Sequence, residues 1–120
     1  MLRPIPERIL RSTALVRVCT GTDIYQNQTY EEYTVSRVHL QPTTEIRKTP
    51  DNADQQLKSL LFVDARHSSP TLDWEGLLRS AHEIGGDMRI TVRGVEYTVL
   101  DIDALRDDTD VLHHWEIGCY

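Results

Sequence analysis

The sequence predicts a mainly β fold, a small antiparallel β-barrel or sandwich of five or six strands, with one short helix and one long loop. Three observations predict it. Two alternating apolar runs flank Arg93-Gly94, which is typical of a β-hairpin. Other short β-rich runs recur along the chain between polar segments. A single stretch, at about residues 72–84, places its apolar residues at helical spacing.

The clearest of these signals is the hairpin within residues 85–102. A two-residue loop fixes the register of the two strands, and side chains alternate between the faces of a strand. The loop at Arg93-Gly94 therefore brings three apolar pairs to one face, which are Val92 with Val95, Ile90 with Tyr97 and Met88 with Val99. The opposite face carries Arg89, Thr91, Glu96 and Thr98, which suit solvent. We expect one face of this hairpin to pack on the core.

The N-terminal half supplies two further strands. The first is expected at Thr13–Thr20, followed by a polar loop over residues 21–30. The second is expected at Tyr33–Gln41, where the apolar pattern changes phase partway along the strand. A β-bulge near Ser36-Arg37 would reconcile the two halves.

The middle of the chain predicts a long loop and then a buried strand. Residues 43–58 are the least hydrophobic region, and we expect a mobile hairpin loop reaching beyond the body, with simple disorder as the alternative. Ser59–Ala65 is an almost continuous apolar run of strand length, so it is expected to cross the core.

The expected helix follows. Its apolar face is formed by Trp74, Leu77, Leu78, Ala81 and Ile84. Ser69 or Thr71 can cap its start, Asp73 and Glu75 suit its positive end, and Gly85-Gly86 can end it. We expect this helix to cover one open end or face of the sheet.

The C-terminal segment predicts a turn and a last strand. Residues 104–110 are acidic and turn-like, and Val111–Tyr120 alternates as a strand. The length of 120 residues fits one domain, with residues 1–12 as an N-terminal arm and residues 13–120 as the β-barrel body.

No set of residues in the sequence indicates catalysis, a cofactor or a metal. His113 and His114 are adjacent on a strand and should point to opposite faces, so they do not form a matched ligand pair. The acidic residues of 101–110 lack the pattern of a calcium loop. Cys19 and Cys119 are expected to be buried free thiols. The net charge of −6 argues against a protein that mainly grips nucleic acid, and no apolar run is long enough to span a membrane.

Three motifs resemble a known family. They are LLFVDA at residues 60–65, GDMRI with the following Gly94 and EYTV at residues 86–99, and LHHWEI at residues 112–117. In this order they resemble the minor capsid proteins of tailed bacteriophages and prophages, over roughly residues 15–117. The helix at residues 71–84 departs from the family pattern, in which a short link leads to the Gly-Asp. Arg93 stands where Asn or Asp is usual.

The resemblance implies a virion component, assembled in the bacterial cytoplasm, without enzymatic activity or cofactor. It implies a head-completion or head-closure connector that forms a homo-oligomeric ring on the portal vertex, although such a subunit can be monomeric before docking. Its partners would be the portal or adaptor and neighbouring head-tail proteins, with only incidental contact with phage DNA. The alternatives are a tail-side ring component, such as a tail terminator or minor tail protein, and a small β-barrel module that binds nucleic acid or peptide.

Two segments are the expected partner contacts, because ring subunits need exposed edges or arms. The candidate residues are Arg3, Pro4 and Ile5 in the N-terminal arm, and Ile46, Arg47, Lys48, Asp51 and Asp54 in the long loop.

Overall fold

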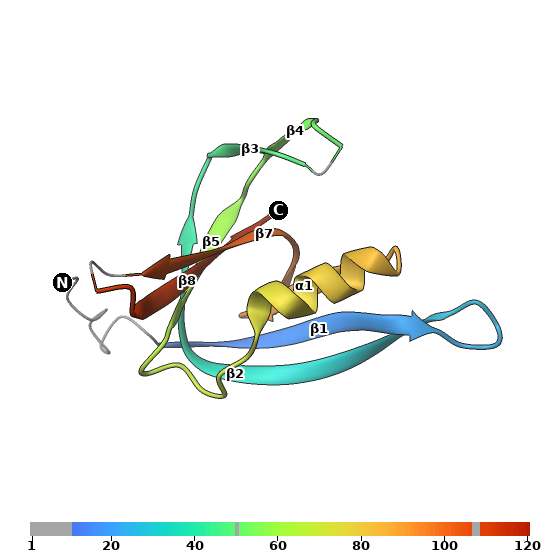
Figure 1. Cartoon of the computed structure of the whole chain (residues 1–120), viewed down its shortest axis with the longest axis horizontal. Coiled ribbons are helices and arrows are strands. Elements are labelled where there is room, and N and C mark those ends of the chain that lie inside the picture. The colour runs from blue at the N-terminus through green and yellow to red at the C-terminus, as the bar shows by residue number, and fades with distance from the viewer. Residues whose placement is uncertain (1–10, 50, 107–108) are drawn as a thin grey trace.

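Six antiparallel strands pair in a closed cycle in the computed structural model, which describes residues 11–49, 51–106 and 109–120 (Figure 1). The strands are β1 (Ser12–Thr22), β2 (Gln28–Pro42), β5 (Ser59–Asp64), β6 (Met88–Val92), β7 (Val95–Arg106) and β8 (Leu112–Cys119). Their order is β1-β2-β5-β8-β7-β6, and β6 pairs back onto β1 to close the barrel. The predicted mainly β fold with one short helix is confirmed.

The β6–β7 hairpin forms in the predicted register. Val92 lies opposite Val95 and Ile90 opposite Tyr97. Arg93 and Gly94 have φ values of 53° and 80°, so both adopt the left-handed conformation that a tight two-residue hairpin turn needs. Val95 is 52% exposed although its partner Val92 is 1% exposed, so Val95 does not pack on the core with the other apolar residues of this face.

The hairpin of β1 and β2 is longer than the sequence predicts. The expected loop at residues 21–30 is wrong, because the strands remain paired as far as Thr22 and Gln28 and only Asp23 to Asn27 form the turn. The end of this hairpin extends past the rest of the barrel (Figure 1), so its side chains can be polar on both faces. Its polar sequence therefore lacks the apolar alternation from which a strand is predicted.

The predicted bulge in β2 is confirmed. The register of β1 with β2 shifts where Ser12 and Thr13 face Val38 and Ser36, and the intervening Arg37 has a φ of 59°. A bulge residue in this conformation changes the phase of the strand. As a result Val35 and Val38, which differ in parity, are both fully buried.

Residues 43–58 are not simply a loop. They contain a small hairpin of β3 (Ile46–Lys48) and β4 (Asp54–Gln56) that projects from the barrel between β2 and β5 (Figure 1). The expected turn at residues 104–110 also begins too early, because β7 continues to Arg106 and pairs with β8. In both places the strands are held by pairing with a neighbour and not by apolar alternation.

Helix α1 (Trp74–Glu83) packs against β1, β6 and β7, and Figure 1 shows it lying along β1. Asp73 caps it by accepting a hydrogen bond from the Gly76 amide, so the predicted caps at Ser69 or Thr71 are wrong. Trp74, Leu78 and Ala81 are buried in the core, as predicted, whereas Ile84 is 52% exposed because the helix has already ended.

The apolar residues form two groups on opposite faces of the sheet. The interior is filled by a core that includes Val16, Leu61, Ile90 and Ile117 together with the helix. A smaller cluster of Leu57, Leu60 and Leu100 lies apart from it. Leu60 alternates with Leu61 along β5, so this second cluster packs on the outside of the barrel.

Among the described residues, no helix is long and apolar enough to cross a membrane.

Candidate interaction surfaces

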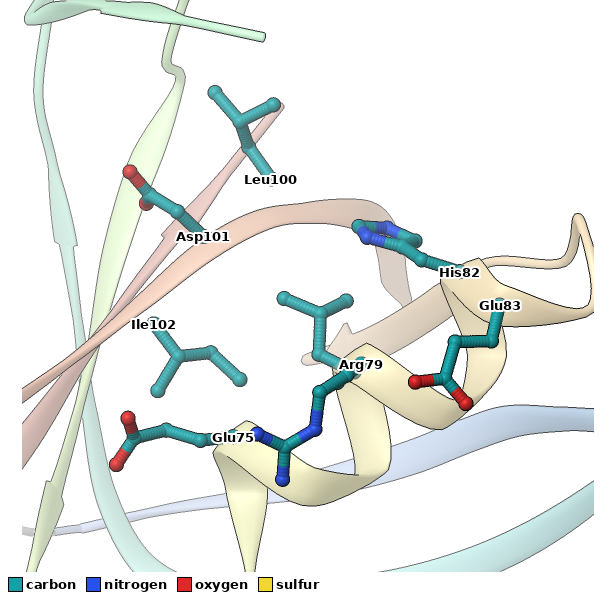
Figure 2. Close-up of a pocket in the computed structure, with 8 residues that line it drawn as sticks. Glu75, Arg79, His82, Glu83, Leu100, Asp101 and Ile102 are labelled. Carbon is teal, nitrogen blue, oxygen red and sulfur yellow. The ribbon is translucent and has the colours of Figure 1, made fainter. Parts of the chain in front are cut away.

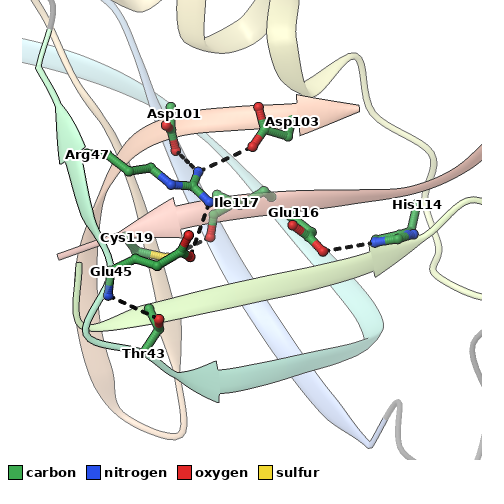
Figure 3. A network of polar contacts seen from close by, with 9 residues as sticks. All are labelled: Thr43, Glu45, Arg47, Asp101, Asp103, His114, Glu116, Ile117 and Cys119. Atoms are coloured by element: carbon green, nitrogen blue, oxygen red, sulfur yellow. Dashed lines mark hydrogen bonds and ion pairs between the residues drawn. The ribbon is translucent and has the colours of Figure 1, made fainter. Parts of the chain in front are cut away.

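The β3–β4 hairpin is fixed to the outside of the barrel by Arg47, as Figure 3 shows. Its Nη1 lies 2.7 Å from Asp101 Oδ1 and 3.3 Å from Asp103 Oδ2, both on β7. Its Nη2 lies 3.4 Å from Glu45 Oε2, at the base of the hairpin. One guanidinium therefore joins the hairpin to a strand that is more than 50 residues away in sequence.

Burial and charge act in opposite directions in this network. Burial of the Arg47 guanidinium favours its neutral form, but Asp101, Glu45 and Asp103 outweigh burial and raise the pKa of Arg47. Burial raises the pKa of Asp101, and Arg47 only partly offsets this. The pKa values of Arg47 and Asp101 therefore both rise, whereas in a simple ion pair the pKa of the carboxyl group would fall. Since burial dominates at Asp101, we regard the network as one that fixes the position of the hairpin and adds little stability.

An apolar contact lies beside this network. Leu57 is 1% exposed and packs on Leu60 and Leu100, which are 8% exposed. Backbone hydrogen bonds fix the same point, since the Leu57 amide donates to Glu45 O at 2.8 Å and the Lys58 amide to Cys119 O at 2.8 Å. The hairpin expected to reach beyond the body is therefore present, and a buried leucine docks its base against the barrel.

The predicted contact residues of this hairpin have different surroundings. Ile46 is 64% exposed, which leaves an apolar side chain on the outer surface. Lys48 and Asp54 form an exposed salt bridge of 2.7 Å across the two strands. Asp51 accepts a hydrogen bond from Thr49 in the turn. Arg47 is occupied within the chain, whereas Ile46 exposes an apolar side chain, and the role of these residues as partner contacts stays a prediction.

The predicted arm residues Arg3, Pro4 and Ile5 lie outside the described residues. Their role stays a prediction.

An open groove runs between α1 and β7 (Figure 2). It measures about 560 Å³, and Leu78, Leu100 and Ile102 supply its apolar lining. Its polar lining comes from Glu75, Arg79, His82, Glu83 and Asp101. A second cavity of about 510 Å³ shares His82 and Leu100 with it and reaches Thr49 and Asp51 of the β3–β4 hairpin. No local pattern in the sequence predicts this groove, because the order of the strands in the barrel brings the helix beside β7.

The tip of the β1–β2 hairpin carries a second surface that the sequence analysis missed. Ile24 and Tyr25 are 87% and 77% exposed. Both residues lie in the segment expected to be a polar loop, so the pattern of that segment does not single them out. An apolar pair inside an otherwise polar turn is the signal that could have revealed them.

The two adjacent histidines do not separate as the alternation of a strand suggests. The Nδ1 atoms of His113 and His114 lie 2.6 Å apart, and the rings meet edge to face. His114 Nε2 also lies 3.3 Å from Glu116 Oε1. Within the described part of the chain, no group of three or more histidine, cysteine or acidic residues could hold a metal ion.

Both cysteines are free and buried, as predicted. Burial raises the pKa of the Cys119 thiol to about 12, so this group stays protonated at neutral pH. They lie on β1 and β8, which do not pair with each other.

Comparisons with known proteins agree with the motifs. A family model described as "Minor capsid protein" matches residues 6–119. A search of curated proteins gives no match.

Proposed function

Because this chain belongs to the minor capsid protein family and is a structural component of the phage virion, we propose that it is a head-completion subunit. In this role it assembles as a ring on the portal vertex, between head and tail, and contacts the portal or adaptor. Its function is structural and not catalytic. Assembly takes place in the bacterial cytoplasm before the subunit enters the virion.

The observation that carries the ring proposal is the closed pairing of the main sheet. A sheet with open edges can join a neighbour by adding strands. Here each of the six barrel strands has two partners within the barrel body, and the distal part of the β1–β2 hairpin keeps one partner per strand. Contacts between copies are therefore left to side-chain surfaces and to the two hairpins that leave the barrel, which suits a heterologous contact repeated around a ring.

The charge of the chain supports a place beside DNA without tight binding to it. The net charge is −6, so a duplex passing through the ring would meet an acidic subunit and be repelled. Tight binding to duplex DNA at low salt would contradict this part of the proposal.

Reconstitution with purified portal tests the proposed role. We expect the protein to co-sediment with portal rings, and electron microscopy to show added ring density on the face of the portal that receives the tail. Association with tail components but not with portal would favour the alternative of a tail-side ring. Binding to oligonucleotide but to neither assembly would favour the small binding module.

Two matched variants make this test specific for the β3–β4 hairpin. Ile46 and Val95 are both β-strand residues and are 64% and 52% exposed. Ile46→Asp should weaken portal binding, because it places a charge on the outer surface of the hairpin. Val95→Asp, beside the β6–β7 turn, should leave binding unchanged. Equal binding by both variants and the unaltered protein would exclude the hairpin as the portal contact.

A further inference from the structure

The tip of the β1–β2 hairpin presents two large apolar side chains to solvent. Ile24 and Tyr25 are the two most exposed large hydrophobic residues of the described chain. They lie at the far end of the longest hairpin, away from the core (Figure 1). Because they are so exposed, they contribute little to the stability of their own fold. Exposed apolar groups of this kind are more informative when they occur together than when they are scattered.

The tip is held in one conformation by its own hydrogen bonds. Asp23 Oδ1 accepts from the amides of Tyr25 at 2.8 Å and Asn27 at 3.0 Å. The Asp23 amide donates to Asn27 O at 2.8 Å, and the Gln26 amide donates to Asp23 O at 3.1 Å. A turn fixed in this way loses little conformational freedom when it binds. The apolar pair is thus preorganised for contact.

The groove between α1 and β7 has the chemistry to receive this tip. Leu78, Leu100 and Ile102 offer an apolar lining, and the volume of about 560 Å³ is within the range of about 300–1,000 Å³ found for binding pockets. Asp101 is bound to Arg47, but two other carboxylates, Glu75 and Glu83, also line the groove. They can accept hydrogen bonds from the Tyr25 hydroxyl and from the side-chain amides of Gln26 and Asn27 at the tip. The single carboxylate of the tip, Asp23, is already engaged with backbone amides, which limits its repulsion from the groove.

We propose that Ile24 and Tyr25 of one copy insert into the α1–β7 groove of a neighbouring copy. The inference rests on the proposed ring and supplies its contact between subunits. Tip and groove are different surfaces, so the contact is heterologous and can repeat from copy to copy around a closed ring. A contact through two side chains is weak between free molecules, and it strengthens when a platform holds the copies side by side.

Intermolecular paramagnetic relaxation enhancement tests this contact, because it detects weak association in solution. A spin label is attached to a Thr22→Cys variant without isotope label, which keeps Ile24 and Tyr25 intact. This sample is mixed at millimolar concentration with ¹⁵N-labelled protein of unaltered sequence. Cys19 and Cys119 are buried, and the raised pKa of the Cys119 thiol further protects it from the label.

We expect selective broadening of the amide signals of residues 75–83 and 100–102. The same label combined with Ile24→Ser and Tyr25→Ser should abolish it, since those changes remove the apolar pair without touching buried residues. A label on Glu96→Cys, in the β6–β7 hairpin, serves as the control for random encounters. Absent broadening, broadening spread evenly over the surface, or broadening unaffected by the two serine substitutions would overturn the proposal.

The outcome is separable from that of the portal experiment. A protein that binds portal without tip-to-groove broadening would keep its proposed role and lose this contact. A protein that shows the broadening and ignores portal would keep the contact and lose the proposed role.

Discussion

Replacing Leu57 with alanine should release the β3–β4 hairpin while leaving the barrel folded. Leu57 is 1% exposed, yet it packs in a small cluster outside the barrel and not in the main core. Removing a buried leucine side chain costs about 2–5 kcal/mol. We expect the lower end, about 2 kcal/mol, because a cluster at the surface can relax more than a core can.

Amide hydrogen exchange would show where this free energy is lost. The amides of Leu57 and Thr49 are both hydrogen-bonded within the hairpin, to Glu45 O and Ala53 O. If the hairpin opens locally, about 2 kcal/mol corresponds to roughly 30-fold faster exchange at these amides. Amides of the barrel strands should keep the exchange rates of the unaltered protein. Ile46→Ala is the matched control, since this residue lies in the same hairpin but is 64% exposed, and its loss should change exchange little.

Two results would refute this reasoning. Unchanged exchange at Leu57 and Thr49 would mean that the buried leucine does not hold the hairpin. Equal acceleration in the hairpin and in the barrel would mean that residues 43–58 belong to the same cooperative unit as the core.

Three further predictions concern the rest of the described structure. Arg47→Met should cost about 1 kcal/mol at neutral pH, since its carboxylate partners are partly solvated. The pKa of Asp101 is already raised by burial and would rise further, so urea unfolding should show a smaller loss at about pH 4, where protons stabilise the folded state, than at about pH 7. Gly86→Ala should lower stability by about 1–3 kcal/mol, because its new methyl group would meet both Cβ and Sγ of the buried Cys19, and an unchanged melting temperature in thermal unfolding would contradict this close approach. Cys19 and Cys119 should both react with a thiol reagent only after unfolding, and rapid labelling of native protein at neutral pH would contradict the burial of these thiols.

Where burial alternates along a strand, the sequence was sufficient to predict the fold. The β6–β7 register follows from the apolar face of each strand and from Gly94, which favours the turn conformation. The phase change in β2 similarly predicted the bulge that the structure places at Arg37. In these segments one face meets the core, so apolar spacing and structure carry the same information.

Where a strand has no buried face, the apolar pattern of the sequence did not predict it. The distal parts of β1 and β2 and the hairpin of β3 and β4 are held by backbone pairing, and polar residues serve there as well as apolar ones. Arg47 was recognised as a residue of the projecting segment, but its bonds to Asp101 and Asp103 join segments that are far apart in sequence. Such a contact requires the three-dimensional order of the strands, which local patterns do not contain.

The two hairpins should therefore contribute differently to assembly. Leu57 and Arg47 fix the β3–β4 hairpin against the barrel, so its exposed Ile46 occupies a defined position relative to the body. The β1–β2 tip is ordered by bonds within its own turn, and its position relative to the body depends on the long paired strands that carry it. A docked hairpin suits a contact whose geometry must be precise, such as the proposed contact with the portal. A preorganised tip on a long two-stranded arm suits a neighbour at a distance, because the arm carries the tip beyond the rest of the barrel.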